Sequence, residues 1–123
     1  MNKVLLDTNF IMNCVQCKID FFEYLENAGF EVLIPEAVLG ELKKVMNSKK
    51  KLKFRQDAEL GFKIVDANKF TKIEMGAKYA DKAIVRYLKD RPDVILATMD
   101  KALKKRVKNP IMVVRARKKI QIV

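Results

Sequence analysis

Short apolar runs that alternate with longer amphipathic stretches constrain the fold of this chain most. The runs at residues 3–6, 32–34, 94–97 and 111–115 are rich in Val, Leu and Ile and too short for helices, so they indicate strands buried on both faces. Strands that alternate with helices form right-handed crossovers and a parallel sheet. The pattern therefore predicts an α/β protein, a three-layer α/β/α sandwich with a mostly parallel central sheet.

Capping and breaking residues predict where the helices begin and end. A helical region is expected over residues 9–27, with a break near Asp20, which can cap a second helix that stops at Gly29. Pro35 is expected to open a helix at its first position, where a missing N–H costs nothing, and that helix runs to about residue 46. The remaining expected elements are helices at 55–67, 76–90 and 101–107 and short strands at 70–73 and 120–123.

Length and composition indicate one domain. The chain has 123 residues, half of them hydrophobic, which is enough for a core without disulfides or a structural metal, so residues 1–123 are expected to form a single domain. No apolar run approaches the roughly 20 residues of a membrane span. Asp7 interrupts the first apolar run before a signal peptide can form. We therefore expect a cytoplasmic protein with no membrane partner.

Two cysteines, Cys14 and Cys17, have the spacing of a redox pair or of half a zinc site. The chain contains no histidine and no second cysteine pair, so a zinc site would need carboxylates or a second subunit. The pair also does not follow a strand, as a thioredoxin-like pair would. The interpretation that these observations favour is two buried or half-buried thiols.

Basic residues are segregated along the sequence. The net charge is +11, and residues 1–42 carry two lysines against seven acids, a net of −5, whereas residues 43–123 carry 24 positive residues against eight acids, a net of +16. Residues 42–56 and 101–123 contain no acid at all. A solubilising surface is one explanation, but this asymmetry favours a nucleic-acid partner. The candidate RNA-binding residues are Lys49, Lys50, Lys51, Lys53, Lys101, Lys104, Lys105, Arg115 and Arg117.

Two aspartates follow predicted strands of the sheet. Asp7 comes directly after the first strand, and Asp100 comes shortly after the strand at 94–97, with Thr98 between. Ligands of such sheets bind beyond the carboxyl ends of the strands, so topology places both acids at one edge. Either aspartate alone could instead cap the helix that follows it.

Two further acids fall on helices at positions where a lone carboxylate is costly. Glu41 lies inside the apolar stripe of its helix, and Asp81 lies at the edge of the side opposite the lysines of its own helix. Burying a carboxylate costs several kcal/mol unless it is paired or bound to a metal. A lysine could pair with Glu41, and a helix N-terminus could stabilise Asp81. A shared metal would satisfy both.

The four acids together predict a metal site. Carboxylates that converge on a cleft repel one another, and a cation removes that repulsion. All-oxygen ligands select Mg²⁺ or Mn²⁺ over zinc or copper. Such an ion polarises a phosphodiester and helps to ionise the attacking water, while the basic surface would bind the substrate's backbone.

Four segments resemble the PIN-domain nucleases in order and spacing: VLLDTNFIM, PEAVLGELKKV, YADKAIVRYL and ILATMDKALKKRV. Carried over residue by residue, the resemblance implies that Asp7, Glu41, Asp81 and Asp100 are the catalytic, metal-binding acids of an endoribonuclease, with Asn9 and Thr98 as supporting polar groups. Two more segments, PIMVVRARKKIQI and NFIMNCVQCKIDFFEYLE, are most similar to the archaeal and eukaryotic branch linked to small-subunit rRNA processing. The resemblance also implies that pre-rRNA could be the substrate and that the chain could form a homodimer.

The sequence departs from the family's pattern at three places. Many members carry a further acid where this chain has Lys82, Lys101 or Ala102, so one tightly held ion is expected rather than two. Two alternatives keep the PIN-like fold: a non-catalytic RNA-binding scaffold in ribosome assembly, and a toxin-type ribonuclease paired with an antitoxin. A phosphoacceptor receiver domain is disfavoured, because the paired acids after the first strand and a central phosphorylated aspartate are missing.

Overall fold

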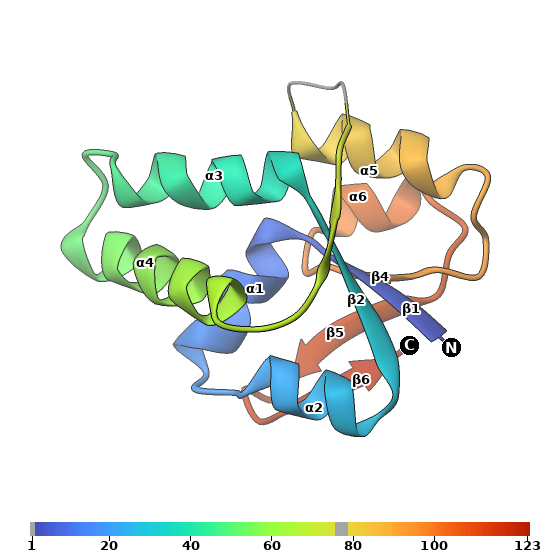
Figure 1. The fold of residues 1–123 in the computed structure, drawn as a ribbon, viewed down its shortest axis with the longest axis horizontal. Coiled ribbons are helices and arrows are strands. Elements are labelled where there is room, and N and C mark those ends of the chain that lie inside the picture. The colour runs from blue at the N-terminus through green and yellow to red at the C-terminus, as the bar shows by residue number, and fades with distance from the viewer. Residues whose placement is uncertain (1, 76–78) are drawn as a thin grey trace.

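One sheet organises the fold of the chain, seen in a computed structural model that describes residues 2–75 and 79–123 (Figure 1). In this part of the chain six strands pair in the order β3-β2-β1-β4-β5-β6, and only β6 runs antiparallel to its neighbour. The strands are β1 (Asn2–Leu6), β2 (Phe30–Pro35), β3 (Thr71–Ile73), β4 (Ile95–Ala97), β5 (Ile111–Arg115) and β6 (Lys119–Ile122).

Helices connect the parallel strands. Figure 1 shows α5 and α6 together on one side of the strands and α2 on the other, as right-handed crossovers in both directions from β1 require. The predicted three-layer α/β architecture is confirmed. The helices of the described residues are α1 (Thr8–Gln16), α2 (Phe21–Asn27), α3 (Glu36–Met46), α4 (Leu52–Asp66), α5 (Ala80–Leu88) and α6 (Lys101–Lys105).

The centre of the sheet is a topological switch point. From β1 the chain moves to β2 on one side, whereas β4 pairs with β1 on the other side, with Leu6 opposite Ala97. The helices after β1 and β4 therefore leave in opposite directions, and a crevice opens between the carboxyl ends of these two strands. This edge of the sheet is where the fold itself provides room for a ligand.

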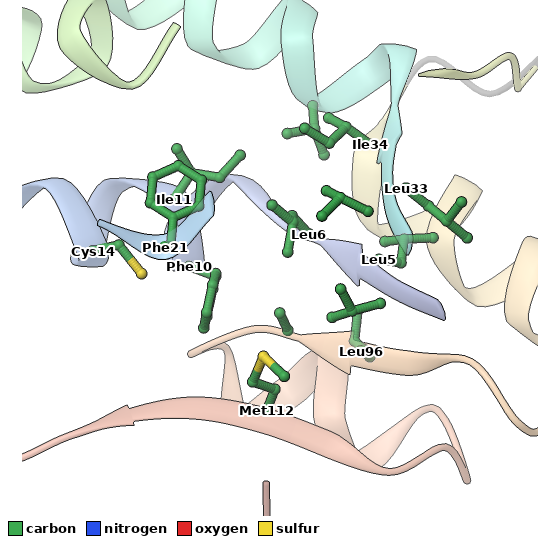
Figure 2. Close-up of a cluster of buried hydrophobic side chains, with 14 of the residues drawn as sticks. Leu5, Leu6, Phe10, Ile11, Cys14, Phe21, Leu33, Ile34, Leu96 and Met112 are labelled. Atoms are coloured by element: carbon green, nitrogen blue, oxygen red, sulfur yellow. The ribbon is translucent and has the colours of Figure 1, made fainter. Parts of the chain in front are cut away.

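The core lies between the sheet and its helices. Leu5, Leu6 and Leu96 are fully buried on the central strands, and Phe10 and Ile11 of α1 pack against them (Figure 2). The continuous apolar strands are explained by this arrangement, since β1 and β4 have helices over both faces.

Caps determine several helix boundaries as predicted. The Asp20 carboxylate accepts a hydrogen bond from the Glu23 N–H at 3.0 Å and begins α2. Gly29 has φ of +80°, a conformation that suits glycine, and it turns the chain from α2 into β2. The helical region predicted over residues 9–27 is two helices, with the break near Asp20 as predicted.

Some predicted boundaries were wrong. Pro35 ends β2 and precedes α3, which begins at Glu36 rather than at the proline itself. The next helix begins at Leu52, not at residue 55, so Lys53 belongs to this helix. The helix expected at 76–90 begins at Ala80, because Tyr79 has extended backbone, and residues 76–78 lie outside the described part.

The cysteines are free thiols. Cys14 is buried in the core and Cys17 is half-buried. Burial, with a smaller contribution from Cys17, raises the pKa of Cys14 to about 12, so this thiol stays protonated. The structural interpretation of the pair is confirmed. In the described residues, no helix has both the length and the apolar character that crossing a bilayer requires.

Candidate active site

A cavity of about 750 Å³ opens at the carboxyl edge of the sheet. Its lining comes from α1, α3, the start of α4, the start of α5 and the loop after β4. All four of the predicted acids line it: Asp7, Glu41, Asp81 and Asp100. Side chains from four separate segments of the sequence therefore converge on one space.

Asp7 is the most buried of these acids, with 6% of its surface exposed. It ends β1 and caps α1, and its Oδ1 accepts the Thr8 N–H at 2.8 Å while its Oδ2 accepts the Thr98 hydroxyl at 2.8 Å. Burial raises the pKa of Asp7 above its ordinary value, these two hydrogen bonds lower it in part, and the negative charges of Glu41 and Asp100 raise it again. The ionised carboxylate is therefore in an environment that a nearby cation would stabilise.

Thr98 and Asn9 link the two central strands behind Asp7. The Thr98 side chain is fully buried, and its oxygen accepts the Asp100 N–H at 3.1 Å. Its single hydroxyl proton has two acceptors in reach, of which the charged Asp7 oxygen is nearer than Asn9 Oδ1 at 3.2 Å. Asn9 Oδ1 also accepts the Met99 N–H at 2.9 Å. This network fixes the loop after β4 against the start of α1.

Asp100 caps a helix and also lines the cavity. It caps α6, and one carboxylate oxygen, Oδ1, accepts the N–H groups of Ala102 at 2.8 Å and Leu103 at 3.2 Å. It also lines the cavity and lies near enough to Asp7 to raise the pKa of that residue. The cap uses Oδ1 alone, so capping does not prevent this carboxylate from facing the cavity.

Glu41 reaches the cavity from the middle of α3. Its side chain is half-buried, and it accepts a hydrogen bond from the hydroxyl of Thr8, the residue that follows Asp7. The apolar position predicted a partner for this carboxylate, either a lysine or a metal. The partner in the structure is a neutral hydroxyl, which leaves the negative charge to be balanced by another group.

Asp81 differs from the expectation. Its side chain is 52% exposed in the first turn of α5, so it does not carry the cost of burial that was predicted for it. Its Oδ1 accepts the Lys82 N–H at 2.9 Å, and its Oδ2 lies 3.3 Å from Nη1 of Arg106, at the end of α6. The helical periodicity placed it near the apolar side, but Ala80 and Ala83 occupy the buried side of the first turn of α5, and Asp81 faces solvent.

The donor set fits a hard divalent cation. Every acidic group at the cavity offers carboxylate oxygen, and threonine and asparagine oxygens lie beside them, which are the ligand types that Mg²⁺ and Mn²⁺ prefer. Within residues 2–75 and 79–123, no three acidic or cysteine side chains are close enough to form a compact metal cage. Mg²⁺ is commonly held by only one or two carboxylates with water completing the shell, so the looser arrangement suits that ion.

The predicted basic residues fall into four groups. Lys50 lines the cavity. Lys53 instead forms an ion pair with the buried Asp57 at 2.7 Å, so its charge is partly engaged. Arg117 lies beside a smaller hollow lined by Asn13 and Gln16, which both line the main cavity too. The others lie at the surface of the α3–α4 loop, of α6 or of the end of β5: Lys49, Lys51, Lys101, Lys104, Lys105 and Arg115.

Sequence reasoning missed several residues of the cavity. Thr8 and Lys44 had a usable signal, because Thr8 directly follows Asp7 and Lys44 lies one helical turn beyond Glu41. Phe54 and Tyr79 had none, since the packing of α4 and α5 around α3 decides that they face this space. Arg106 could be paired with Asp81 only once α5 and α6 were placed together.

Comparison with known proteins adds independent support for the fold and family. A family model described as a PIN like domain matches residues 4–119. Ribonuclease VapC4 of Methanocaldococcus jannaschii is 33% identical and covers 99% of this chain and 97% of its own length. The rRNA-processing protein fcf1 of Schizosaccharomyces pombe is also 33% identical, over 85% of this chain, which spans only about half (53%) of that protein.

Solved structures agree. The structure of the PIN domain endonuclease Utp24 superposes with a TM-score of 0.79 at 30% identity and covers 98% of this chain and 90% of its own. A more distant match, VapBC2 from Rickettsia felis bound to a DNA fragment, has a TM-score of 0.55 at 15% identity, covers 90% of this chain and 98% of its own, and supports the fold alone.

Proposed function

The chain belongs to the PIN-like domain family, and from this premise we propose that it is a divalent-metal-dependent endoribonuclease. One observation carries the proposal: Asp7, Glu41, Asp81 and Asp100, which come from four separate segments, line one cavity at the switch point of the sheet. Relatives named as a ribonuclease and as a PIN domain endonuclease support the reaction type.

The four acids are proposed to hold one Mg²⁺ or Mn²⁺ ion. When bound, such an ion polarises the phosphodiester and lowers the pKa of the attacking water. Asp7 is kept in one orientation by the hydrogen bonds from Thr8 and Thr98, so it presents its charge to the cavity without rearrangement. Asn9 and Thr98 act as positioning residues, because they fix the loop that carries Asp100.

Lysines of the cavity are proposed to bind the RNA backbone. Lys44 and Lys50 line the cavity together with the acids, and the surface of the α3–α4 loop and of α6 extends the positive charge beyond it. Phosphates would be attracted to these lysines and then held beside the acids, where the bond is hydrolysed. Positive and negative side chains in one cavity would thus orient the substrate.

The direct test is cleavage of a labelled RNA in Mn²⁺. Asp100→Asn removes a ligand charge but keeps an oxygen that can cap α6, so we expect loss of at least about a hundredfold in rate with the melting temperature within a few degrees. Asp93→Asn is the matched control, because Asp93 is an exposed acid at the opposite edge of the sheet. Equal activity in wild type and Asp100→Asn would remove the site assignment.

A non-catalytic RNA scaffold is the second candidate. The ion pair between Asp81 and Arg106 favours it, because an arginine already balances one of the acids, and so do Lys82, Lys101 and Ala102 at positions where many members carry acids. A scaffold would bind RNA in a salt-sensitive manner and show no Mn²⁺-dependent turnover. Turnover that depends on Asp100 excludes it.

The substrate is proposed to be pre-rRNA, on the basis of the relative named as an rRNA-processing protein. A toxin-type ribonuclease with an antitoxin partner is the alternative. Mapping the cut sites in total RNA distinguishes them, since a single cut in a precursor supports processing and cuts in mature RNAs support a toxin.

We propose that this activity takes place in the cytoplasm, a reducing compartment that suits the two free thiols. That the chain forms a homodimer stays a prediction, which a mass measurement by light scattering would test.

A further inference from the structure

Two aromatic rings line the same cavity as the acids. Phe54 lies in the first turn of α4 and is half-buried, and Tyr79 lies just before α5 and is 54% exposed. Neither ring takes part in the chemistry proposed above. Both are nevertheless exposed to the space in which the substrate would lie.

A lysine ammonium lies over the face of each ring. The Nζ of Lys50 lies 5.5 Å from the centroid of the Phe54 ring, and the Nζ of Lys82 lies 5.8 Å from the centroid of the Tyr79 ring. Both lysines are exposed, so their long side chains can move at little cost. The same unit, an aromatic face with a mobile cation beside it, therefore occurs twice at the cavity.

The two rings belong to different helices around Glu41: Phe54 to α4 and Tyr79 to the start of α5. Glu41 is on α3, and α3 packs against both α4 and α5. Figure 1 shows α4 and α5 near opposite ends of α3; Phe54 belongs to the first turn of α4, and Tyr79 directly precedes α5, two residues before Asp81. A strand of RNA that crosses the acids would meet one ring before them and the other after them.

Aromatic faces beside cations match the chemistry of an unpaired nucleotide. A nucleobase stacks on an aromatic ring through its own face, and its phosphate needs a cation within reach. A base that stacks on the ring would displace the ammonium, and the released ammonium could then bind the adjacent phosphate. In a duplex the bases are already stacked and paired, so they offer no face to either ring.

We propose that Phe54 and Tyr79 are stacking platforms for the bases on either side of the cleaved phosphate, with Lys50 and Lys82 binding the phosphates next to them. The inference rests on the proposed RNA substrate. It makes these rings specificity-determining residues: the cavity accepts RNA that is unpaired at both flanks of the cut and rejects duplex RNA.

Binding is measured in EDTA, so that no RNA is cut, by fluorescence anisotropy of a labelled single-stranded 12-mer and of the same 12-mer in a duplex. Tyr79→Leu and Phe54→Leu should each weaken single-strand binding about tenfold and leave duplex binding unchanged. The slope of log K against log salt should stay the same in both variants, because no phosphate contact is lost. Lys50→Gln and Lys82→Gln should instead reduce that slope by about 0.7 each.

Matched controls separate stacking from folding. Tyr24→Leu removes an exposed tyrosine of α2 that is not in the cavity lining, and it should bind as the wild type does. Tyr79→Phe and Phe54→Tyr keep the rings and should also retain wild-type affinity. If Phe54→Leu does not fold, the stacking role is tested by Tyr79→Leu, with Tyr79→Phe and Phe54→Tyr as the variants that keep a ring.

Base fluorescence gives a second readout. With 2-aminopurine at either flank of the cut site, emission should fall on binding to the wild type and stay high with the corresponding leucine variant. Leucine variants that bind the single strand as tightly as the wild type, or a wild type that binds duplex equally well, would overturn the proposal. Absence of Mn²⁺-dependent cleavage would refute the nuclease function and leave this binding result intact.

Discussion

The environment of the Asp7 carboxylate links stability to function at the scale of one residue. Burial is the largest cause that raises its pKa, and the charges of Glu41 and Asp100 add to it. The folded protein therefore binds the Asp7 proton more tightly than the unfolded chain does. Ionised Asp7 costs stability in the metal-free protein, and a bound cation would reverse that cost.

A pH prediction follows for the metal-free protein. With its pKa raised in the folded state, Asp7 contributes stability below the ordinary value of 3.8 that is lost as pH rises through the raised value. The difference in unfolding free energy between Asp7→Asn and wild type, measured with urea in EDTA, should therefore move in favour of Asp7→Asn as pH rises from 4 to 7. A difference that is independent of pH would contradict the raised pKa.

Thr98 is predicted to be the most sensitive neutral residue of the site. Thr98→Val keeps the shape but leaves Asp7 Oδ2 and the Asp100 N–H without their buried partner. We expect a loss of about 2 kcal/mol in stability, measured by urea unfolding, together with weaker Mn²⁺ binding, measured by calorimetry. Thr98→Ser, which retains the hydroxyl, should recover most of the metal affinity. Normal Mn²⁺ binding by the valine variant would show that the hydroxyl does not position the acids.

At this site, the sequence predicted which acids line the cavity better than it predicted which groups those acids contact. Asp7 and Asp100 were predictable because position after a parallel strand is itself a spatial statement. The partner of Glu41 was not, because the Thr8 hydroxyl reaches it only once α1 and α3 are packed. The exposure of Asp81 was also misjudged, because Ala80 and Ala83 occupy the buried side of the first turn of α5.

At the scale of elements, α3 carries Glu41 and contacts both α4 and α5, so its stability matters to the site. Gly40 lies within α3, and a Cβ added there would meet nothing within 4 Å. Gly40→Ala should therefore stabilise the protein by about 1 kcal/mol through helix propensity, measured by urea unfolding, with cleavage retained. The control is Gly61→Ala on α4, where the added Cβ would lie 3.1 Å from Ile11 Cγ2 and crowd α1. Equal gains from both substitutions would contradict the packing of α4 on α1.

Element types were predicted well from periodicity, and boundaries less well. The strand at Ile111–Arg115 agrees to the residue, because its apolar run has a turn on each side. The start of α4 was placed too late, at residue 55, although Lys53 before it is a good helix former. Local composition cannot reveal that Lys53 has a buried Asp57 one turn away to support it.

At the scale of the whole molecule, a metal would couple four segments that are far apart in the sequence. Binding to the folded state alone stabilises a protein by about 2.7 kcal/mol at a hundredfold excess over the dissociation constant. We expect Mn²⁺ to raise the melting temperature of the wild type by several degrees and EDTA to remove the effect. Asp7→Asn and Asp100→Asn should show little of this shift, whereas Asp93→Asn should show all of it. A shift that persists in both site variants would place the ion elsewhere.

Topology explains how much of the molecule could be foreseen. Alternating strands and helices predicted the parallel sheet, and the sheet predicted that acids after β1 and β4 would meet. The antiparallel pairing of β6 with β5 and the pairing of Arg106 with Asp81 were not predictable, because both depend on how finished elements lie side by side.

The central claim is that one hard cation is shared by acids from four segments. Anomalous diffraction from a crystal soaked in Mn²⁺ tests it most directly. We expect a single strong peak in the cavity, in contact with oxygens of Asp7 and Asp100 and within reach, directly or through water, of Glu41 and Asp81. A fully soaked crystal with no peak there, or with its only peak at another face, would contradict it.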